Sequence, residues 1–350
     1  MQTKIWRVDP QTPDETLLAE AAQAILSGQL VAFPTETVYG LGANAFDRQA
    51  VRRVFLAKGR PAQDPLIVHL ADAELLSQVA REIPPFAETL ARAFWPGPLT
   101  LVLPKQEGVL DEITAGLPTV AVRVPAHAVA LGLLRASGVP IVAPSANRFG
   151  HVSPTTAQHV LEDLGGLIEG ILDGGSTHVG VESTVLDLTC TPPHLLRPGG
   201  VSLEALQEQI GEVVYLPQKP PEEGELTAQR SPGLLAKHYA PQAELWLFAG
   251  QRERALQNMR QTAEQACRSG RRVGVLVGEE ARGFFSELPL VLYSLGSEQR
   301  YDEMAKRLYA GLRALDRQGV ELILAREVTG EGLGLAIRDR LRRAASRVIE

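Results

Sequence analysis

Short apolar runs, each followed by a polar stretch rich in glycine and proline, recur along the first two thirds of the chain. Residues 30–33 have the length and composition of a buried strand. After Pro34, hydrogen-bonding side chains fill four of five positions before Gly40 and Gly42. This pattern predicts a ligand-binding loop at the end of a strand, and an ordinary Pro-Gly turn is the alternative.

Helical periodicity separates several of these runs. Thr12 is predicted to cap a helix that Gly28 stops, and Asp47 to cap a second helix that ends at Lys58 and Gly59. Ser153 is expected to cap a third helix, whose free N–H groups would suit a phosphate.

The remaining pattern predicts a mixed α/β domain over residues 1–213. Its other expected strands are 4–8, 65–70, 99–103, 119–124, 140–143, 168–172, 183–188 and 194–197, and its other helices are 72–80, 85–94 and 202–210.

Hydrophobic periodicity is lost over residues 214–242, where prolines and acidic residues predict an interdomain linker. A bare spacer does not need a Leu234-Leu235 pair followed by His238 and Tyr239. We therefore expect the second half of the linker to fold back over the ligand site of the first domain and to exclude water from it.

Strands alternate with helices over residues 243–350, which predicts a smaller Rossmann-like domain with an open parallel sheet. Its sequence GEGLG at 330–334 resembles a dinucleotide-binding loop only faintly. It lacks the full GxGxxG spacing and a following acidic residue, so the pattern does not favour a bound dinucleotide.

Composition and charge narrow the class of protein. No apolar run reaches the roughly 18 residues of a membrane helix, and the first residues lack the plan of a signal peptide, so a cytoplasmic protein is expected. Cys190 and Cys267 are isolated and are interpreted as small buried hydrophobes. Residues 1–212 carry a net charge of −9 and the rest +3, which argues against non-specific nucleic-acid binding by the first domain.

Cations recur beside hydroxyl-bearing loops of the first domain, at Lys58, Arg60, Arg123, Arg148 and Arg197. Point charges next to neutral donors are what a polyphosphate requires, so a basic cleft is expected. Taken singly, each cation is more often a solvated surface charge, and it is their joint placement that favours a phosphate site. The sequence contains no Walker A loop, HExxH, GxSxG or kinase signature.

Two further titratable residues leave alternatives open. His69, within an apolar strand, is either a satisfied core histidine or faces the site, because its neighbours point the other way. Glu182 is either a metal ligand or base, or an acceptor of backbone hydrogen bonds.

Eight ordered blocks together resemble the YrdC-type threonylcarbamoyl-AMP synthases in their long, two-domain form. The blocks are PTETVYGLG at 34–42, KGRP at 58–61, PLIVHL at 65–70, GPLTLVL at 97–103, VAVRVP at 120–125, PSAN with SPT at 144–155, ESTVLDL at 182–188 and LRPGG at 196–200. Each block is weak alone, but their succession is specific. The SPG and HYAP segments, at 231–233 and 238–241, and the extra C-terminal domain resemble the long form, so the resemblance spans essentially the whole chain.

The resemblance implies a reaction that joins L-threonine, bicarbonate or CO2 and ATP into L-threonylcarbamoyl-AMP and pyrophosphate. The adenylate feeds threonylcarbamoylation of tRNA next to the anticodon through downstream transferase machinery, with weak or no tRNA binding by this chain. By motif, the residues implied to hold ATP are Arg60, Asp64, Thr119, Ser145, Asn147, Ser153, Arg197 and Tyr239. Those implied to hold threonine are Thr37, His69, Arg123, Ala143 and Ser183.

Lys58 and Arg60 are the implied catalytic pair, and Asp64 departs from the family, which usually has Asn there. A carboxylate at this position repels phosphate unless Mg2+ or a cation meets it. Mg2+ is expected to bind through the ATP phosphates and water, because no carboxylate cluster is visible.

Three alternatives to this reading of the sequence remain. An RNA-binding module would use the same basic residues, and a YrdC-like domain also occurs in hydrogenase-maturation carbamoyl transferases. The latter are expected to carry an acylphosphatase region and zinc-type cysteine pairs, whereas this chain has two isolated cysteines. The third alternative is a chain inactivated by Asp64.

Overall fold

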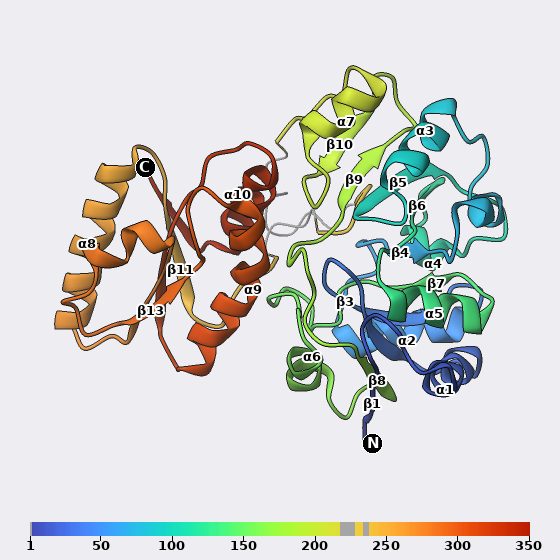
Figure 1. The fold of residues 1–350 in the computed structure, drawn as a ribbon, viewed down its shortest axis with the longest axis horizontal. Helices are drawn as coiled ribbons and strands as arrows, with labels where there is room; N and C mark the ends of the chain where they lie inside the picture. Colours follow the sequence, from blue (N-terminus) through green and yellow to red (C-terminus); the bar gives the residue numbers. More distant parts are fainter. Residues whose placement is uncertain (1, 218–227, 234–237) are drawn as a thin grey trace. The chain divides into compact units, whose positions relative to one another are not determined.

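The computed structural model describes residues 2–217, 228–233 and 238–350 (Figure 1). The chain divides into two compact units. The first comprises Met1–Phe149 and Ser153–Ala236, and the second comprises Gly150–Val152 and Lys237–Glu350.

Ten strands of the first unit, counted over the described residues, form one mixed sheet in the order β1-β8-β2-β3-β7-β4-β6-β5-β9-β10. The bounds are β1 Lys4–Arg7, β2 Val31–Pro34, β3 Tyr39–Asn44, β4 Ile67–His69, β5 Leu99–Pro104, β6 Thr119–Arg123, β7 Ile141–Val142, β8 Gly170–Asp173, β9 Thr184–Asp187 and β10 His194–Arg197. Parallel pairs such as β4–β6 stand beside antiparallel pairs such as β5–β6, which confirms the predicted mixed α/β class.

Helices cover this sheet, and α1 and α5 lie side by side (Figure 1). The helices are α1 Glu15–Leu26, α2 Arg48–Lys58, α3 Pro85–Phe94, α4 Asp111–Thr114, α5 Ala128–Ser137, α6 Ala157–Leu164 and α7 Leu203–Ile210, with a 3-10 turn η1 at Ala73–Gln78. The apolar faces of α1 and α5 pack on β2 and β8 in one hydrophobic cluster. Burial of these faces removes apolar area from water and stabilises this half of the sheet.

Two predicted helix caps are wrong. Asp14, not Thr12, caps α1, because the Thr12 hydroxyl donates to Asp9 instead. Thr156, not Ser153, caps α6. The cap at Asp47 and the end of α2 at Lys58 and Gly59 are confirmed, with Gly59 in the left-handed conformation, and Ser202 caps α7.

The polar segment after β2 is a hairpin turn and not an open loop. Pro34 continues the pairing and lies opposite Tyr39 in the antiparallel β2–β3 pair. The predicted loop glycines therefore lie within β3, where close packing excludes a side chain. A Cβ at Gly42 would lie 2.8 Å from the Phe33 ring and 2.9 Å from the Val31 carbonyl oxygen.

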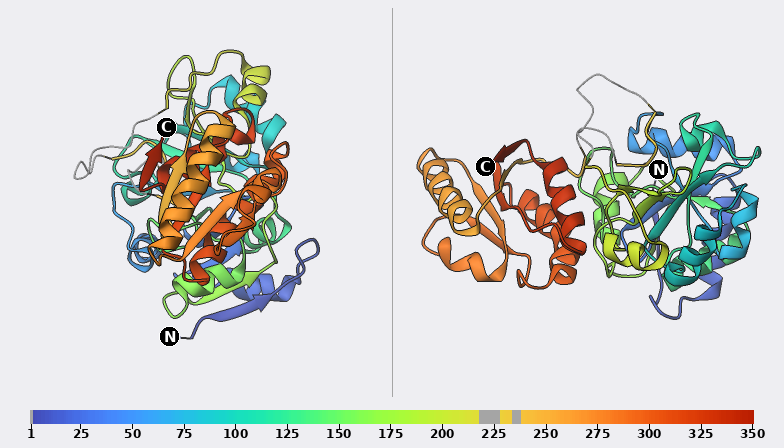
Figure 2. Two further views of the ribbon diagram at one scale, coloured as in Figure 1. Left: turned by 90° about the vertical axis from the view of Figure 1, so that its left-hand side faces the viewer. Right: turned by 90° about the horizontal axis from the view of Figure 1, so that it is seen from above.

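The second unit contains a parallel sheet in the order β13-β12-β14-β11-β15, which confirms the predicted Rossmann-like class. Its elements are β11 Glu244–Phe248, α8 Arg252–Arg268, β12 Val273–Val277, η2 Glu279–Phe284, β13 Val291–Ser294, α9 Tyr301–Arg317, β14 Leu322–Arg326, α10 Leu333–Ala344 and β15 Arg347–Ile349. Helix α8 covers one face, and α9 and α10 cover the other (Figures 1 and 2). The short strand β15 was not predicted.

Both cysteines are free and only partly buried, so their interpretation as buried hydrophobes is wrong. Among the described residues, no helix is long and apolar enough to cross a membrane.

Substitution of Gly42 by alanine should destabilise the first unit by about 1–3 kcal/mol, because the added methyl overpacks the β2–β3 hairpin. Gly108→Ala is the matched control, since a Cβ there meets no heavy atom within 4 Å. Urea unfolding should show a lower midpoint for Gly42→Ala alone. Equal midpoints for the two variants would contradict the packing argument.

Candidate active site

Four cations are buried among the described residues of the first unit: Lys58, Arg60, Arg123 and Arg197. Arg148 is exposed and donates to the Asp163 carbonyl, so the structure does not bring it into this group. Cations are rarely buried unless they are paired or hydrogen-bonded. The partners of these four residues therefore define the candidate site.

Lys58 joins the end of helix α2 to the PSAN segment after β7. Its ammonium donates to the carbonyl oxygens of Ser145, at 2.5 Å, and Asn147, at 2.6 Å. Burial, reinforced by the neighbouring Arg60, holds the pKa of Lys58 well below its usual range. The KGRP and PSAN blocks are thus in direct contact.

Arg60 turns its guanidinium onto the segment that follows it. It donates to the carbonyl oxygens of Asp64, at 2.9 Å, and Pro65, at 2.7 Å. It also forms an ion pair with the buried Asp64 carboxylate, with Nη2 and Oδ2 2.9 Å apart. A cation therefore meets the carboxylate at the position where the family usually has Asn.

Arg197 is held at the end of β10 by the turn before β9. Its Nη2 donates to the Ser183 carbonyl at 2.9 Å and to the Ser183 hydroxyl at 3.1 Å. That hydroxyl also lies 2.8 Å from the hydroxyl of Thr100. The Arg197 Nη1 donates to the Pro232 carbonyl at 3.1 Å.

Residues 228–233 of the expected linker pack on these same groups. The Gly233 N–H donates to Asp64 Oδ1 at 3.4 Å, and the Pro232 carbonyl accepts from Arg197. Arg230 forms an ion pair with the buried Asp187 at 2.8 Å. The Leu234-Leu235 pair lies outside the described residues.

Tyr239 belongs to the second unit and is not among the groups that the first unit brings together. It is buried, with its ring stacked 5.9 Å from that of Tyr309 and the Arg340 guanidinium 4.9 Å from its centre. Its φ of 62° is uncommon for a residue with a side chain, and the packed rings compensate for this backbone strain.

Arg123, at the end of β6, interacts with three residues. Its Nη1 donates to the Thr37 hydroxyl at 3.0 Å and its Nε to the Gly97 carbonyl at 3.2 Å. Its Nη2 lies 2.5 Å from Oε1 of the buried Glu36. Sequence reasoning did not assign Glu36 to the site, although its place between two threonines of the PTETVYG turn was a usable signal.

His69 lies next to Arg123, because the two residues pair across the parallel strands β4 and β6. Burial, with a further contribution from the Arg123 charge, lowers the pKa of His69 to about 3. Its Nδ1 lies 3.2 Å from the Ile67 carbonyl oxygen. His69 is therefore both a buried core residue and a neutral neighbour of Arg123.

The remaining predicted residues lie on the same sheet or its connections. The Ser153 hydroxyl donates to Oε1 of the buried Glu182 at 2.6 Å, while Ser145 bridges to Gly40 of β3. The Ala143 N–H donates to the Ile67 carbonyl, and Thr119 begins β6, half-buried. Among the described residues, no cluster of three His, Cys, Asp or Glu side chains is suited to a metal ion.

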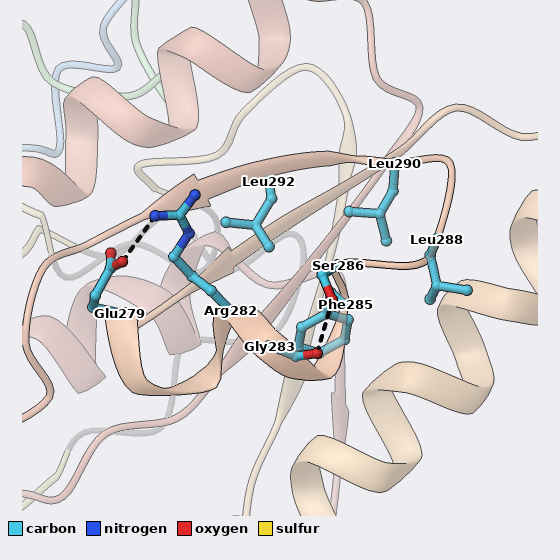
Figure 3. A pocket seen from close by; sticks show the side chains of 8 residues that line it. All are labelled: Glu279, Arg282, Gly283, Phe285, Ser286, Leu288, Leu290 and Leu292. Atoms are coloured by element: carbon cyan, nitrogen blue, oxygen red, sulfur yellow. Dashed lines mark hydrogen bonds and ion pairs between the residues drawn. The ribbon is translucent and has the colours of Figure 1, made fainter.

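A separate pocket of about 470 Å³ lies in the second unit, between η2 and β13 (Figure 3). Three leucines and Phe285 line part of it, and the Glu279–Arg282 ion pair lies at one side. Its lining is mixed, and it does not share the buried cations of the first unit.

Two family models match successive parts of the chain. A model described as "Telomere recombination" matches residues 23–199, and one described as "Threonylcarbamoyl-AMP synthase, C-terminal domain" matches residues 201–346.

Curated relatives and a solved structure match over nearly the full length. A threonylcarbamoyl-AMP synthase of Pyrococcus abyssi is 49% identical over 95% of this chain and 95% of its own length. One of Bacillus subtilis is 45% identical over 99% of this chain and 98% of its own length. The crystal structure of P. abyssi Sua5 complexed with L-threonine is similar with a TM-score of 0.92 and 47% identity, covering 99% of this chain and 100% of that chain.

The buried, neutral His69 should make the protein less stable as the pH falls below 6.5. The unfolded chain takes up a proton at this residue below its ordinary pKa of 6.5, whereas the folded chain does so only near pH 3. Urea unfolding between pH 7 and 5 should show a loss of up to about 1.4 kcal/mol per pH unit from this group.

His69→Gln should reduce that slope, to which the lowered pKa of His127 also contributes, and His194→Gln, at the half-buried start of β10, should not. An unchanged slope in His69→Gln would show that His69 is not the group responsible.

Proposed function

The chain belongs to the threonylcarbamoyl-AMP synthase family, and we propose that it joins L-threonine, bicarbonate or CO2 and ATP into L-threonylcarbamoyl-AMP and pyrophosphate. In this proposal it is a nucleotidyltransferase whose product serves threonylcarbamoyladenosine modification of tRNA next to the anticodon. The observation that carries the proposal is the direct contact of Lys58 with the Ser145–Asn147 segment, beside Arg60.

The phosphates of ATP are assigned to the buried cations that backbone carbonyls hold in place. Arg60 and Arg197 are pre-oriented by their hydrogen bonds, so little side-chain entropy is lost when a polyphosphate binds. Asp64 neutralises part of the Arg60 charge. The residues proposed to hold ATP are Arg60, Asp64, Thr119, Ser145, Asn147, Ser153, Arg197 and Tyr239.

The amino acid is assigned to the side of the site around Arg123, whose planar guanidinium suits a carboxylate. Hydroxyl partners such as Thr37 and Ser183 would favour threonine over valine, because valine leaves a buried hydroxyl unsatisfied. His69 and the backbone at Ala143 complete the proposed threonine site.

The reaction itself requires no covalent enzyme nucleophile. The threonine amine is carboxylated to a carbamate, whose oxygen attacks the α-phosphorus while pyrophosphate leaves. Positioning of the reactants and neutralisation of phosphate charge supply the catalysis. Lys58 and Arg60 are assigned these roles, and Mg2+ is proposed to enter with ATP, through the phosphates and water.

The linker is proposed to cover the reactants. The contacts of residues 228–233 with Asp64 and Arg197 support this, because those residues are also assigned to ATP. Cover at this position would exclude water from a labile adenylate.

Radiolabelled bicarbonate should enter an acid-labile adenylate only when ATP and L-threonine are both present. Lys58→Ala and Arg60→Ala should each reduce the rate at least about 100-fold, as expected when a buried charge aimed at the transition state is removed. Asp64→Asn, which restores the usual family residue, should retain activity.

Arg135→Ala, at an exposed position on α5, is the matched control and should leave the rate unchanged. A folded wild type that forms no threonine-dependent product would reject the proposed function. Tight, salt-sensitive RNA binding by that protein would favour the RNA-binding alternative.

If the linker covers the site, variants that detach it should yield less intact threonylcarbamoyl-AMP, because water reaches the adenylate. Arg230→Glu, which places two negative charges together at Asp187, should lower the ratio of threonylcarbamoyl-AMP to free AMP. Removal of all residues after 215 should lower the ratio further. Arg268→Glu, exposed on α8, is the control. A wild-type ratio in both linker variants would contradict the proposal that the linker covers the reactants.

A further inference from the structure

We propose that Glu36 is a substrate-binding residue: its carboxylate receives the amino group of the amino-acid substrate while Arg123 receives the substrate carboxylate. The inference rests on the proposed function and deepens it, since it assigns the amine to a residue outside the set carried over from the family. It follows from the position of Glu36, from its unfilled hydrogen-bonding capacity and from the charge balance around it.

The turn between β2 and β3 fixes the Glu36 backbone. The Thr35 hydroxyl accepts from the N–H groups of Thr37 and Val38, which closes the turn on itself. The Glu36 carbonyl accepts from the N–H groups of His178, at 3.1 Å, and Val179, at 2.8 Å. The side chain therefore leaves a backbone that is anchored from two directions, as a preorganised binding residue requires.

The Glu36 side chain is buried with its hydrogen-bonding capacity largely unfilled. Only 7% of the side chain is exposed, and its Oε1 meets Arg123 Nη2 at 2.5 Å as an ion pair. Within the described part of the chain, neither carboxylate oxygen has a partner in hydrogen-bond geometry, and Oε1 is held only by this ion pair. Buried polar groups are nearly always hydrogen-bonded, so a buried carboxylate whose Oε2 has no partner indicates a ligand.

Arg123 and Glu36 match the carboxylate and the amine of an amino acid. A guanidinium presents donors to a carboxylate, and a carboxylate presents acceptors to an ammonium or amine. Arg123 also places Thr37 at its edge through a 3.0 Å hydrogen bond. The substrate carboxylate and amine are bonded to one carbon atom, and the adjacent Glu36 and Arg123 would bind them together.

The charges around the pair also balance. Burial lowers the pKa values of the two neighbouring imidazoles, His69 to about 3 and His127 to about 4. Both histidines are therefore neutral at neutral pH and add no positive charge to the Glu36–Arg123 ion pair. A binding site that presents one carboxylate and one guanidinium suits a zwitterion and disfavours a substrate that carries only one of the two charges.

The competing explanation is that Glu36 only orients Arg123. In that case Glu36 would affect every ligand whose carboxylate binds Arg123, whether or not the ligand has an amino group. A ligand that lacks the amine therefore distinguishes direct contact between Glu36 and the amine from an indirect effect of Glu36 on the orientation of Arg123.

Isothermal titration of the full chain, without ATP, tests this with L-threonine and its des-amino analogue, in which hydrogen replaces the amino group. Wild type should bind L-threonine roughly 10- to 100-fold more tightly than it binds the des-amino analogue, because a charge-assisted hydrogen bond to the amine contributes that much affinity. Glu36→Gln should reduce that ratio to less than about threefold while changing the affinity for the analogue little. Glu88→Gln, exposed on α3, should behave like wild type.

Three results would overturn the inference. Equal weakening of both ligands in Glu36→Gln would assign Glu36 a positioning role through Arg123, and an undiminished ratio would exclude any contact with the amine. Equal affinity of wild type for the two ligands would overturn it even if Glu36→Gln failed to fold. A wild type that binds neither ligand would instead reject the proposed function itself.

Discussion

Burial of positive charge is the constraint on which the first unit depends. Lys58, Arg60, Arg123 and Arg197 are almost inaccessible to solvent, and each would be strongly destabilising without compensation. Backbone carbonyl oxygens compensate all four: those of Ser145 and Asn147, of Asp64 and Pro65, of Gly97, and of Ser183 and Pro232. Carbonyl partners hold a cation in place without cancelling its charge, so a phosphate or carboxylate still experiences it.

Carboxylates complete this arrangement at two positions. Asp64 pairs with Arg60 and Glu36 with Arg123, and both pairs are buried. A buried ion pair adds little stability when it is compared with apolar residues of the same size, so its presence is better explained by specificity than by folding. In this chain the two pairs lie where the proposed reaction needs different ligands, a phosphate at Arg60 and an amino acid at Arg123.

The two parts of the linker region have different anchors. Residues 228–233 pack on Asp64, Arg197 and Asp187 of the first unit. Tyr239 is fixed in the second unit by Tyr309 and Arg340. Residues 228–233 thus contact groups of the proposed ATP site, whereas Tyr239 belongs to the packed core of the second unit.

Local pattern alone determined the classes of both domains and most strands and helices, because these features depend on hydrophobic periodicity within a few residues of chain. The KGRP and PSAN blocks were identified by their resemblance to a known family. Only the tertiary structure decided that Gly40 and Gly42 lie in a strand, since the requirement for glycine comes from Phe33, Val31 and Ala143 across the sheet. It likewise placed Glu36 beside Arg123 and Asp64 beside Arg60 and Gly233, because those contacts depend on how strands and turns distant in sequence are brought together.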